Sequence, residues 1–128
     1  MALPKILDIG FKIDDHKLWE LDIPIEEINI SDIDYNLDIP YLEKMGTDDW
    51  NLSPRMLIQN FDKEKLHASR TRKVDLKYPI EIYKHQGKWI ILDGVHRFTK
   101  AVLEGHKTIK VRKLTDEIID KNREIIKL

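Results

Sequence analysis

The sequence lacks cysteine altogether, and its 128 residues hold no long apolar run. Without cysteine the chain can form no disulfide bond, no thiolate zinc site and no cysteine nucleophile. Its longest apolar runs, such as residues 89–92, are far shorter than the ~20 residues of a membrane-spanning helix. The opening sequence MALPKILDIG also lacks a basic region followed by an apolar stretch. We therefore expect a cytoplasmic protein with no membrane partner.

The sequence also has almost no net charge, since it contains 22 Lys and Arg residues and 23 Asp and Glu residues. The charges are unevenly distributed, because residues 1–53 hold 13 acidic and 4 basic side chains, whereas residues 54–128 hold 10 and 18. An acidic part that packs beside a basic part leaves no strongly positive face. This disfavours DNA as a partner, because duplex binders gain affinity by neutralising phosphates. A small phosphorylated ligand needs only a local cluster of donors.

The length fits one domain, since a chain of this size removes roughly two-thirds of its surface from water on folding. No repeat or low-complexity tract divides the sequence. We expect an N-terminal arm over residues 1–16 and a domain over residues 17–128, with an acidic, ligand-facing loop at 33–53 and an amphipathic helix at 115–128. Strand and helix patterns are interleaved, which predicts a small mixed β-sheet with packed helices, of the α+β class.

Periodicity predicts the elements of the N-terminal half. Alternating apolar and polar residues predict a strand that begins at residue 17 and ends near Pro24. The sequence IPYLEKM within the acidic loop is consistent with one helical turn. Ser53 followed by Pro54 is typical of an N-cap with proline at the first helical position, and it predicts a short helix. Asp62 is the expected cap of a second helix, in which Leu66 is one of few apolar residues.

The C-terminal half begins with two β-rich runs, PIEIYK and KWIIL, which predict a hairpin with its turn at residues 85–87. Just before the hairpin, Pro79 fixes an extended path after Tyr78, and Asp75 can accept backbone N–H bonds, which indicates a structural role. The run TIKVRKL predicts a further strand. Thr115 is the expected cap of the last helix, which turns four isoleucines inward: Ile118, Ile119, Ile125 and Ile126.

The informative segment is the turn Asp93-Gly94 between a strand and a helix that begins at Val95. The free N–H groups of the first helical turn point outward there, beside a residue with no side chain, and this geometry binds anions. Arg97 supplies a fork of donors suited to phosphate, and His96 can donate or exchange a proton near neutral pH. Cations oppose the helix dipole at this end, which is explained if an anion lies between them.

A purely structural interpretation of this turn stays open. Asp93 can simply cap the helix, Gly94 can simply make the turn, and Arg97 can pair with Asp93. The helix that follows has Val95, Phe98, Ala101 and Val102 on one face and Gly105 as its C-terminal stop.

Other candidate ligand contacts lie upstream of the turn. His67 and Arg70 are three residues apart, so they share a helix face and can reach one ligand, although a solvated basic face is the alternative. Arg55 is a further candidate phosphate contact with the same alternative. Trp50, in the acidic loop, either covers a nucleotide or docks the loop. No two histidines at i, i+4 enclose a glutamate, so we expect no zincin-type metal site, and Mg²⁺ would arrive with a nucleotide.

The run PIEIYKHQGKWIILDGVHRFTKAVLEGHKTIKVRKL resembles the core of the ParB/sulfiredoxin superfamily, in which a D-G-x-H-R-like box holds nucleotide phosphates at a helix N-terminus. Since LWELDIPIEEI resembles the first strand of that fold, the resemblance covers residues 19–114, and the Gly94-His96-Arg97 box is its most specific part. The pattern SPRMLIQNFDKEKLHASRTRKVDLKYPI before ILDGVHRFTKA is similar to small bacterial ParB-like proteins, which also have a histidine and an arginine at the positions of His67 and Arg70.

Differences between this sequence and members of that superfamily reduce the number of functions that the resemblance allows. Sulfiredoxins have a catalytic cysteine where this chain has Val95, so sulfinic acid reductase activity is excluded. Chromosome-partition ParB proteins have an acidic residue and a second arginine in place of His96 and Arg97, and they carry a downstream helix-turn-helix domain, whereas 14 residues follow Leu114 here. The superfamily's free serine kinases have aspartate, glycine, histidine and arginine arranged as they are at Asp93, Gly94, His96 and Arg97.

The resemblance implies a protein that binds ATP, ADP or another nucleotide such as CTP or NAD, with Mg²⁺. The phosphates would contact Gly94, Val95, His96, Arg97, His67 and Arg70. In an enzymatic version, a phosphotransferase or NTPase with a small-molecule or protein acceptor, Asp93 and His96 are the catalytic residues: Asp93 holds magnesium or positions the acceptor, and His96 orients the phosphoryl group or shuttles a proton. Two alternatives stay open: a non-catalytic nucleotide-dependent binding module, and a DNA-associated or nuclease-type ParB-like protein.

Overall fold

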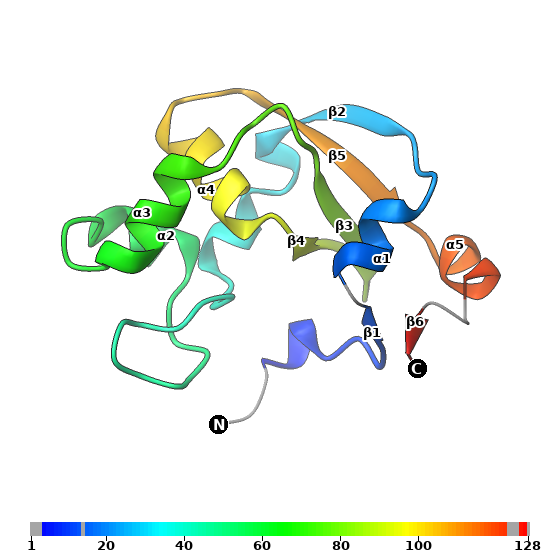
Figure 1. Ribbon diagram of the computed structural model, residues 1–128, viewed down its shortest axis with the longest axis horizontal. Coiled ribbons are helices and arrows are strands. Elements are labelled where there is room, and N and C mark those ends of the chain that lie inside the picture. Colours follow the sequence, from blue (N-terminus) through cyan, green and yellow to red (C-terminus); the bar gives the residue numbers. More distant parts are fainter. Residues whose placement is uncertain (1–3, 14, 123–125, 128) are drawn as a thin grey trace.

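The structure of the protein is a computed structural model that describes residues 4–13, 15–122 and 126–127. At its centre is a four-stranded sheet in the order β2-β5-β3-β4, in which β5 pairs parallel with β3 and the other pairs are antiparallel. The strands are β2 (Ile25–Asn29), β3 (Ile80–His85), β4 (Lys88–Asp93) and β5 (Thr108–Leu114). This mixed sheet with packed helices confirms the α+β class (Figure 1).

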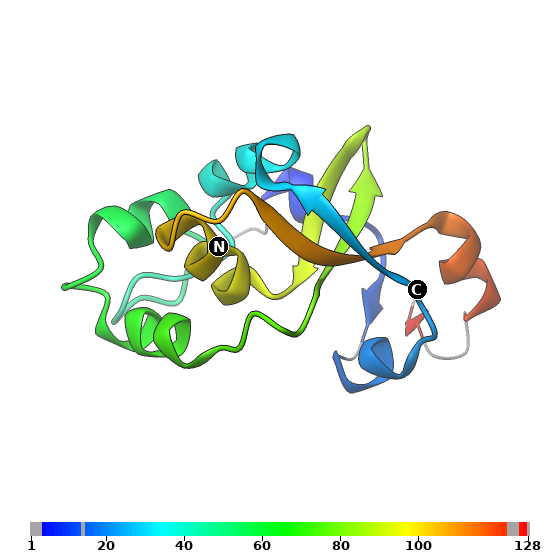
Figure 2. The same ribbon diagram turned by 90° about the horizontal axis from the view of Figure 1, so that it is seen from above.

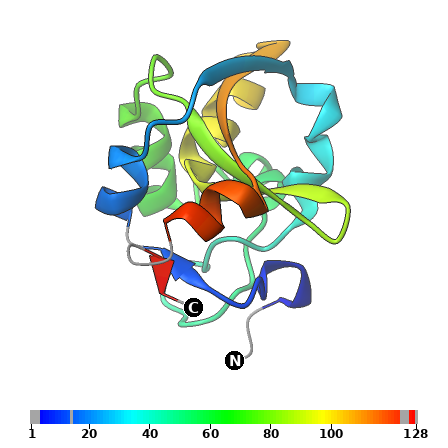
Figure 3. The same cartoon turned by 90° about the vertical axis from the view of Figure 1, so that its right-hand side faces the viewer.

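Helices gather at both ends of the sheet. At one end lie α2 (Pro54–Gln59), α3 (Lys65–Lys73) and α4 (Val95–Leu103), and at the other lie α1 (Asp15–Glu20) and α5 (Asp116–Lys121), as Figure 2 shows from above. The short strands β1 (Lys12–Ile13) and β6 (Ile126–Lys127) pair with each other below α5 (Figure 3). Single 3₁₀ turns are η1 (Lys5–Leu7), η2 (Ile30–Asp32) and η3 (Asp34–Asp38).

The central strand β3 is buried on both faces. Its alternate residues Ile80 and Ile82 pack in one apolar cluster with Phe98 of α4, whereas Tyr83 packs in a second cluster with Leu18 of α1. Side chains of one strand therefore connect the α4 side of the sheet to the α1 side. Any polar residue on β3 lies in a dry environment and needs a partner.

The predicted β3–β4 hairpin forms, but its turn is one residue shorter than the predicted 85–87, because His85 belongs to β3. The two turn residues, Gln86 and Gly87, have φ values of 51° and 79°. A register shift follows at its other end, because Ile82 pairs with Ile91 whereas Glu81 pairs with Asp93. One extra residue of β4 is thus accommodated as a bulge, and the bulge places Asp93 opposite Glu81.

Three predicted helix ends are confirmed. Ser53 caps α2 by accepting a hydrogen bond from the Met56 N–H at 3.2 Å, with Pro54 at the first position. Thr115 caps α5 in the same way. Beyond α4, Gly105 adopts a φ of 76°, which is the left-handed conformation that ends helices.

The predicted strand that begins at residue 17 and ends near Pro24 was wrong, because residues up to Glu20 form α1 and the strand β2 begins only at Ile25. Leu18 of α1 is completely buried, and Leu21 and Ile23 are buried in the segment between α1 and β2. All three pack in the same apolar cluster.

No helical turn forms at IPYLEKM. Tyr41 is instead inserted into the core, where its hydroxyl donates to Asn36 Oδ1 and accepts from the Ile91 N–H of β4 at 2.9 Å. Asn36 Nδ2 donates to the Trp89 carbonyl. These contacts fix the start of the acidic loop to β4, so tertiary hydrogen bonds replace those of a local helix.

The second predicted helix starts later than expected. Asp62 does not cap it, because α3 begins at Lys65. Leu66 is 53% exposed, and the inward residues of α3 are His67, Ala68 and Thr71. The inward face of α3 is thus largely polar, which indicates a role other than core packing.

The last predicted helix is shorter than residues 115–128, because α5 ends at Lys121 and residues 126–127 form β6. Of its expected inward residues, Ile118 and Ile119 join the α1 cluster, Ile126 lies in β6, and Ile125 lies outside the described residues. The expected N-terminal arm contains η1 and β1, and Ile6, Leu7 and Ile9 pack against the core.

A buried ion pair crosses the sheet beneath α1. Arg112 of β5 lies opposite Glu81 of β3, and its Nη1 is 3.1 Å from Glu81 Oε1. The same guanidinium donates to the carbonyls of Leu18, Leu21 and Ile23, so it holds the end of α1 onto the sheet. The side chains are almost completely buried, at 7% and 2% exposure.

We predict that Arg112→Met lowers the free energy of unfolding by about 3–5 kcal/mol, because it leaves Glu81 buried without its partner. The double variant Arg112→Met/Glu81→Leu should recover part of that loss, since both charges are then absent. Urea unfolding of the three proteins measures the difference. A double variant less stable than Arg112→Met would contradict this interpretation.

Candidate functional site

The predicted turn has the expected strand-turn-helix geometry. Gly94 adopts a φ of 101° at the N-cap of α4, and its carbonyl accepts the first helical hydrogen bond from the Phe98 N–H at 2.9 Å. Because the N-cap residue has no side chain, it leaves the N–H groups of the first turn without a side-chain cap. This end of α4 is therefore suited to an anion.

The requirement for glycine at the turn comes from the fold itself. A Cβ on Gly94 would lie 2.6 Å from Ile80 Cγ2 and 3.2 Å from Arg97 Nε. The positive φ is a second reason that any other residue would be strained. Close packing on β3 thus accounts for this glycine without a ligand.

Arg97 pairs with Asp93, as the structural interpretation of the turn has it. Its Nη2 is 3.2 Å from Asp93 Oδ2, and its Nη1 donates to the Pro79 carbonyl at 2.9 Å. The same carboxylate oxygen accepts a hydrogen bond from Trp19 Nε1 of α1 at 2.7 Å. Asp93 and Arg97 therefore face α1 and the start of β3.

His96 belongs to a different group, which includes His67 and Arg70 of α3. Its Nε2 lies 3.0 Å from His67 Nδ1, and His67 Nε2 lies 2.8 Å from the Glu43 carbonyl. A carbonyl oxygen can only accept, so His67 Nε2 carries a proton, and in a neutral His67 the Nδ1 atom is the acceptor. His96 Nε2 then donates to it, which leaves His96 Nδ1 with a free lone pair.

Burial, together with the electrostatic influence of His67 and Arg70, lowers the pKa of His96 to about 4. His96 is therefore neutral near pH 7. Three nitrogen-rich side chains share a small space with the open end of α4. An anion bound there would favour the protonated form of His96, which could then donate a hydrogen bond from Nδ1.

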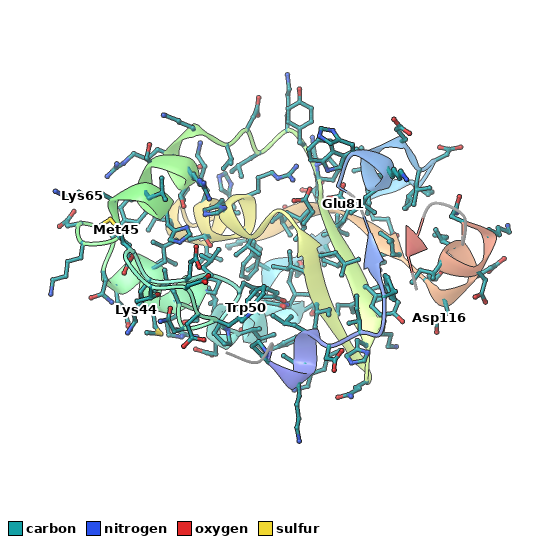
Figure 4. All side chains as sticks on the ribbon, turned by 60° about the horizontal axis from the view of Figure 1, so that its bottom comes forward. Lys44, Met45, Trp50, Lys65, Glu81 and Asp116 are labelled. Carbon is teal, nitrogen blue, oxygen red and sulfur yellow. The ribbon has the colours of Figure 1, made fainter. Side chains whose placement is uncertain are left out.

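A cavity of about 290 Å³ adjoins His67 and Arg70. Its opposite wall is the acidic loop, which contributes Tyr41, Asp48 and Trp50. Trp50 is 43% exposed, and Figure 4 shows it in that loop. The expected ligand-facing loop thus borders the candidate site.

The predicted site residues therefore form two groups. His67 and Arg70 line the cavity beside the acidic loop, and His96 contacts His67 behind it. Asp93 and Arg97 instead join Trp19 at the α1 side. Arg55 belongs to neither group, because it pairs with Asp38 at 2.7 Å on the surface. Over residues 4–13, 15–122 and 126–127, no group of three or more metal-ligating side chains could hold an ion.

Sequence reasoning missed Glu81 and Arg112. The available signal was a glutamate in the middle of the apolar run PIEIY, because such a residue needs a buried partner. Sequence reasoning also missed the contact between Trp19 and Asp93, because it predicted a strand where the structure has α1.

No protein-family model matches the sequence, and a search of curated proteins finds no match. Two solved structures match. Sulfiredoxin from Arabidopsis thaliana is 18% identical with a TM-score of 0.37, and the match covers 77% of this chain and 94% of that one. The C-terminally truncated chromosome-partitioning protein ParB from Caulobacter crescentus, complexed with CTP-γ-S, is 17% identical with a TM-score of 0.39, and the match covers 79% and 53%.

One match is a sulfiredoxin and the other is a ParB protein. This chain spans about half of the matched ParB chain. Likeness at this level does not extend to a site or an activity, so the functional argument depends on the geometry above. Within the part of the chain that the structure describes, no helix has the length and apolar character to cross a bilayer.

We predict that Gly94→Ala lowers the Tm far more than Gly105→Ala does. Both glycines have a positive φ, which costs an alanine about 1–2 kcal/mol. Only Gly94 would also bring a Cβ against Ile80, and overpacking adds about 1–3 kcal/mol. Thermal unfolding of the two variants measures the difference, and equal losses would exclude the contact with β3 as the cause.

We predict that stability falls as the pH drops from about 6.5 towards 4, in part because of His96. Its pKa is lowered in the folded protein, so the unfolded chain binds the proton first over this range. His96→Gln should therefore lose less Tm between pH 7 and pH 4.5 than the wild type. If the Tm of both proteins fell equally over this pH range, burial of a neutral His96 would not be a cause of the loss.

Proposed function

We propose that the protein binds a nucleotide with its phosphates between α3 and the first turn of α4. The observation that carries the proposal is the convergence of His67, Arg70 and His96 on the uncapped end of α4. Arginine offers a planar fork of donors, helix N–H groups offer further donors, and the helix dipole favours negative charge. This combination is the chemistry of phosphate recognition.

The resemblance of the box to nucleotide-binding members of the ParB/sulfiredoxin superfamily supports the same assignment. ATP or ADP is the preferred ligand, and CTP and NAD are the alternatives. Val95 would contribute a backbone N–H, and Trp50 offers an exposed ring on which a base can stack. Arg97 would reach a phosphate only by exchanging its bond to Asp93 for one to the ligand.

Magnesium would enter with the nucleotide. Mg²⁺ commonly keeps several waters and takes one or two carboxylates together with substrate phosphates. Asp48 and Asp49 of the acidic loop line the cavity and are the carboxylates that would face such an ion. The ion would neutralise phosphate charge there.

A phosphotransferase or NTPase differs from a binding module in having a group that accepts a proton. His96 Nδ1 is that candidate, because Nε2 is committed to His67 in the tautomer described above. Asp93 acts on the reaction only through Arg97 and Trp19 in this arrangement, as a positioning residue. Phosphoryl transfer is accordingly the enzymatic version of the proposal, and nucleotide binding is its core.

Isothermal titration with ATP, ADP, CTP, GTP and NAD, each with Mg²⁺, tests the binding. We expect Arg70→Ala and His96→Gln to raise the Kd of the preferred nucleotide about tenfold to a hundredfold, because each removes a contact to a charged group. Arg55→Ala is the matched control, since its partner Asp38 lies outside the cavity, and it should leave the Kd unchanged.

Absence of binding by the wild type, or equal losses in Arg55→Ala and Arg70→Ala, would overturn the proposal. An assay of ATP consumption with hydroxyl-bearing acceptors, including serine, then separates the two versions. Consumption that His96→Gln abolishes identifies an enzyme. Binding without consumption over hours identifies a binding module.

A further inference from the structure

A larger cavity, of about 830 Å³, lies on the α1 side of the sheet. It is bounded by α1 and the chain after it, by the segment before β3, and by β3 itself. Two aromatic residues form its rim: Trp19 is 50% exposed and Tyr78 is 56% exposed. Ile23, Ile25 and Pro79 add apolar wall.

The segment before β3 thus does more than guide the chain. Asp75 does accept a backbone N–H bond, from Lys77 at 2.9 Å, as predicted. Tyr78, however, packs outward at the rim and not into the core. An exposed aromatic rim over a cavity is typical of a binding surface rather than of a purely structural turn.

Glu81 of β3, which Figure 4 labels, is the most buried of the residues that line this cavity and forms its floor. Its side chain is 2% exposed, and Oε1 pairs with Arg112. Oε2 is shielded from water and accepts no hydrogen bond from any residue that the structure describes. A buried carboxylate oxygen without a partner is costly, so the floor lacks a donor or a positive charge.

The two arginines that line the cavity are already committed. Arg112 donates to three carbonyls as well as to Glu81, and Arg97 is bonded to Asp93 and to the Pro79 carbonyl. Burial and, to a lesser extent, the negative charge of Asp93 raise the pKa of Glu81 to about 7, against the opposing effect of Arg97 and Arg112. An additional cation at the floor would stabilise the ionised carboxylate.

We propose that this cavity binds a small organic amine, with a flat apolar body between Trp19 and Tyr78 and a protonated amino group over Glu81. The aromatic faces attract a cation and cover its apolar body. The cavity lining holds three carboxylates and three basic side chains, Asp22, Asp75 and Glu81 with Lys73, Arg97 and Arg112, so it has no excess of positive charge that would oppose an amine. This inference is independent of the proposed nucleotide site, because the two cavities share no lining residue.

Three indoles that differ only in their head group test the inference: tryptamine, tryptophol and indole-3-acetate. Tryptamine is titrated into the protein while NMR records the chemical shifts of the backbone amides. We expect the shifts to change around Tyr78 and Glu81. Tryptophol should bind about tenfold more weakly, because it lacks the cation, and indole-3-acetate more weakly still. Equal or tighter binding of either analogue would overturn the inference.

Variants locate the binding and separate it from that of the nucleotide. Tyr78→Ala should weaken tryptamine about tenfold and leave nucleotide affinity unchanged. Trp50→Ala, an exposed aromatic of the other cavity, is the matched control and should leave tryptamine affinity unchanged. Loss of tryptamine binding in Trp50→Ala but not in Tyr78→Ala would contradict the inference, whichever nucleotide result is obtained.

The pH dependence tests the role of Glu81. Tryptamine affinity should rise between pH 6 and pH 8, as the carboxyl that faces Asp93, Arg97 and Arg112 becomes ionised. Glu81→Gln should weaken binding and remove the rise. If tryptamine affinity still rose with pH in that variant, the role of Glu81 would be overturned. If the variant does not fold, the Tyr78→Ala variant and the three indoles test the amine site instead.

Discussion

The ion pair between Arg112 and Glu81 determines how the two ends of the molecule fit together. It crosses from β5 to β3 in a buried part of the sheet, where neither charge could be stable alone. Arg112 uses its remaining donors on the carbonyls at the end of α1, so a single guanidinium attaches that helix to the sheet. Trp19 of the same helix then reaches Asp93. Arg112 therefore also holds in place the part of the larger cavity wall that α1 and the residues after it form.

The first turn of α4 separates two chemical environments. Arg97 turns towards Asp93 and the α1 side, whereas His96, one residue earlier, turns towards His67. Consecutive residues of a helix point about 100° apart, so a two-residue motif can serve two cavities. Gly94 sets the position of both, because close packing on Ile80 fixes where the helix begins. The same turn thus borders the proposed phosphate site on one side and holds a tethered arginine on the other.

Local patterns predicted much of this fold. The Ser53-Pro54 cap, the hairpin turn, β5 and the helix after Gly94 depend on neighbouring residues, and all of them form. Tertiary contacts decided the rest: Arg112 stabilises a helix where alternation suggested a strand, and the Tyr41 hydroxyl holds an extended segment. These partners lie 50 or more residues away in sequence, where periodicity carries no information.

The candidate site was predictable only in part for the same reason. The spacing of His67 and Arg70 and the turn at Gly94 indicated donors, and the structure brings His67 to His96. The sequence could not show that Arg97 faces away from them, since that depends on Asp93. The bulge in β4 moves Asp93 to the Glu81 face, and a one-residue register shift leaves no trace in composition or period.

The contacts that hold the acidic loop also protect the sheet. The strand β4 lies at an edge, so its outward N–H and C=O groups would be free to pair with a strand of another chain. Tyr41 accepts from the Ile91 N–H, and Asn36 and Tyr35 donate to the Trp89 carbonyl, so side chains occupy the positions that a fifth strand would use. The segment that borders the smaller cavity therefore also closes the sheet against edge-to-edge aggregation.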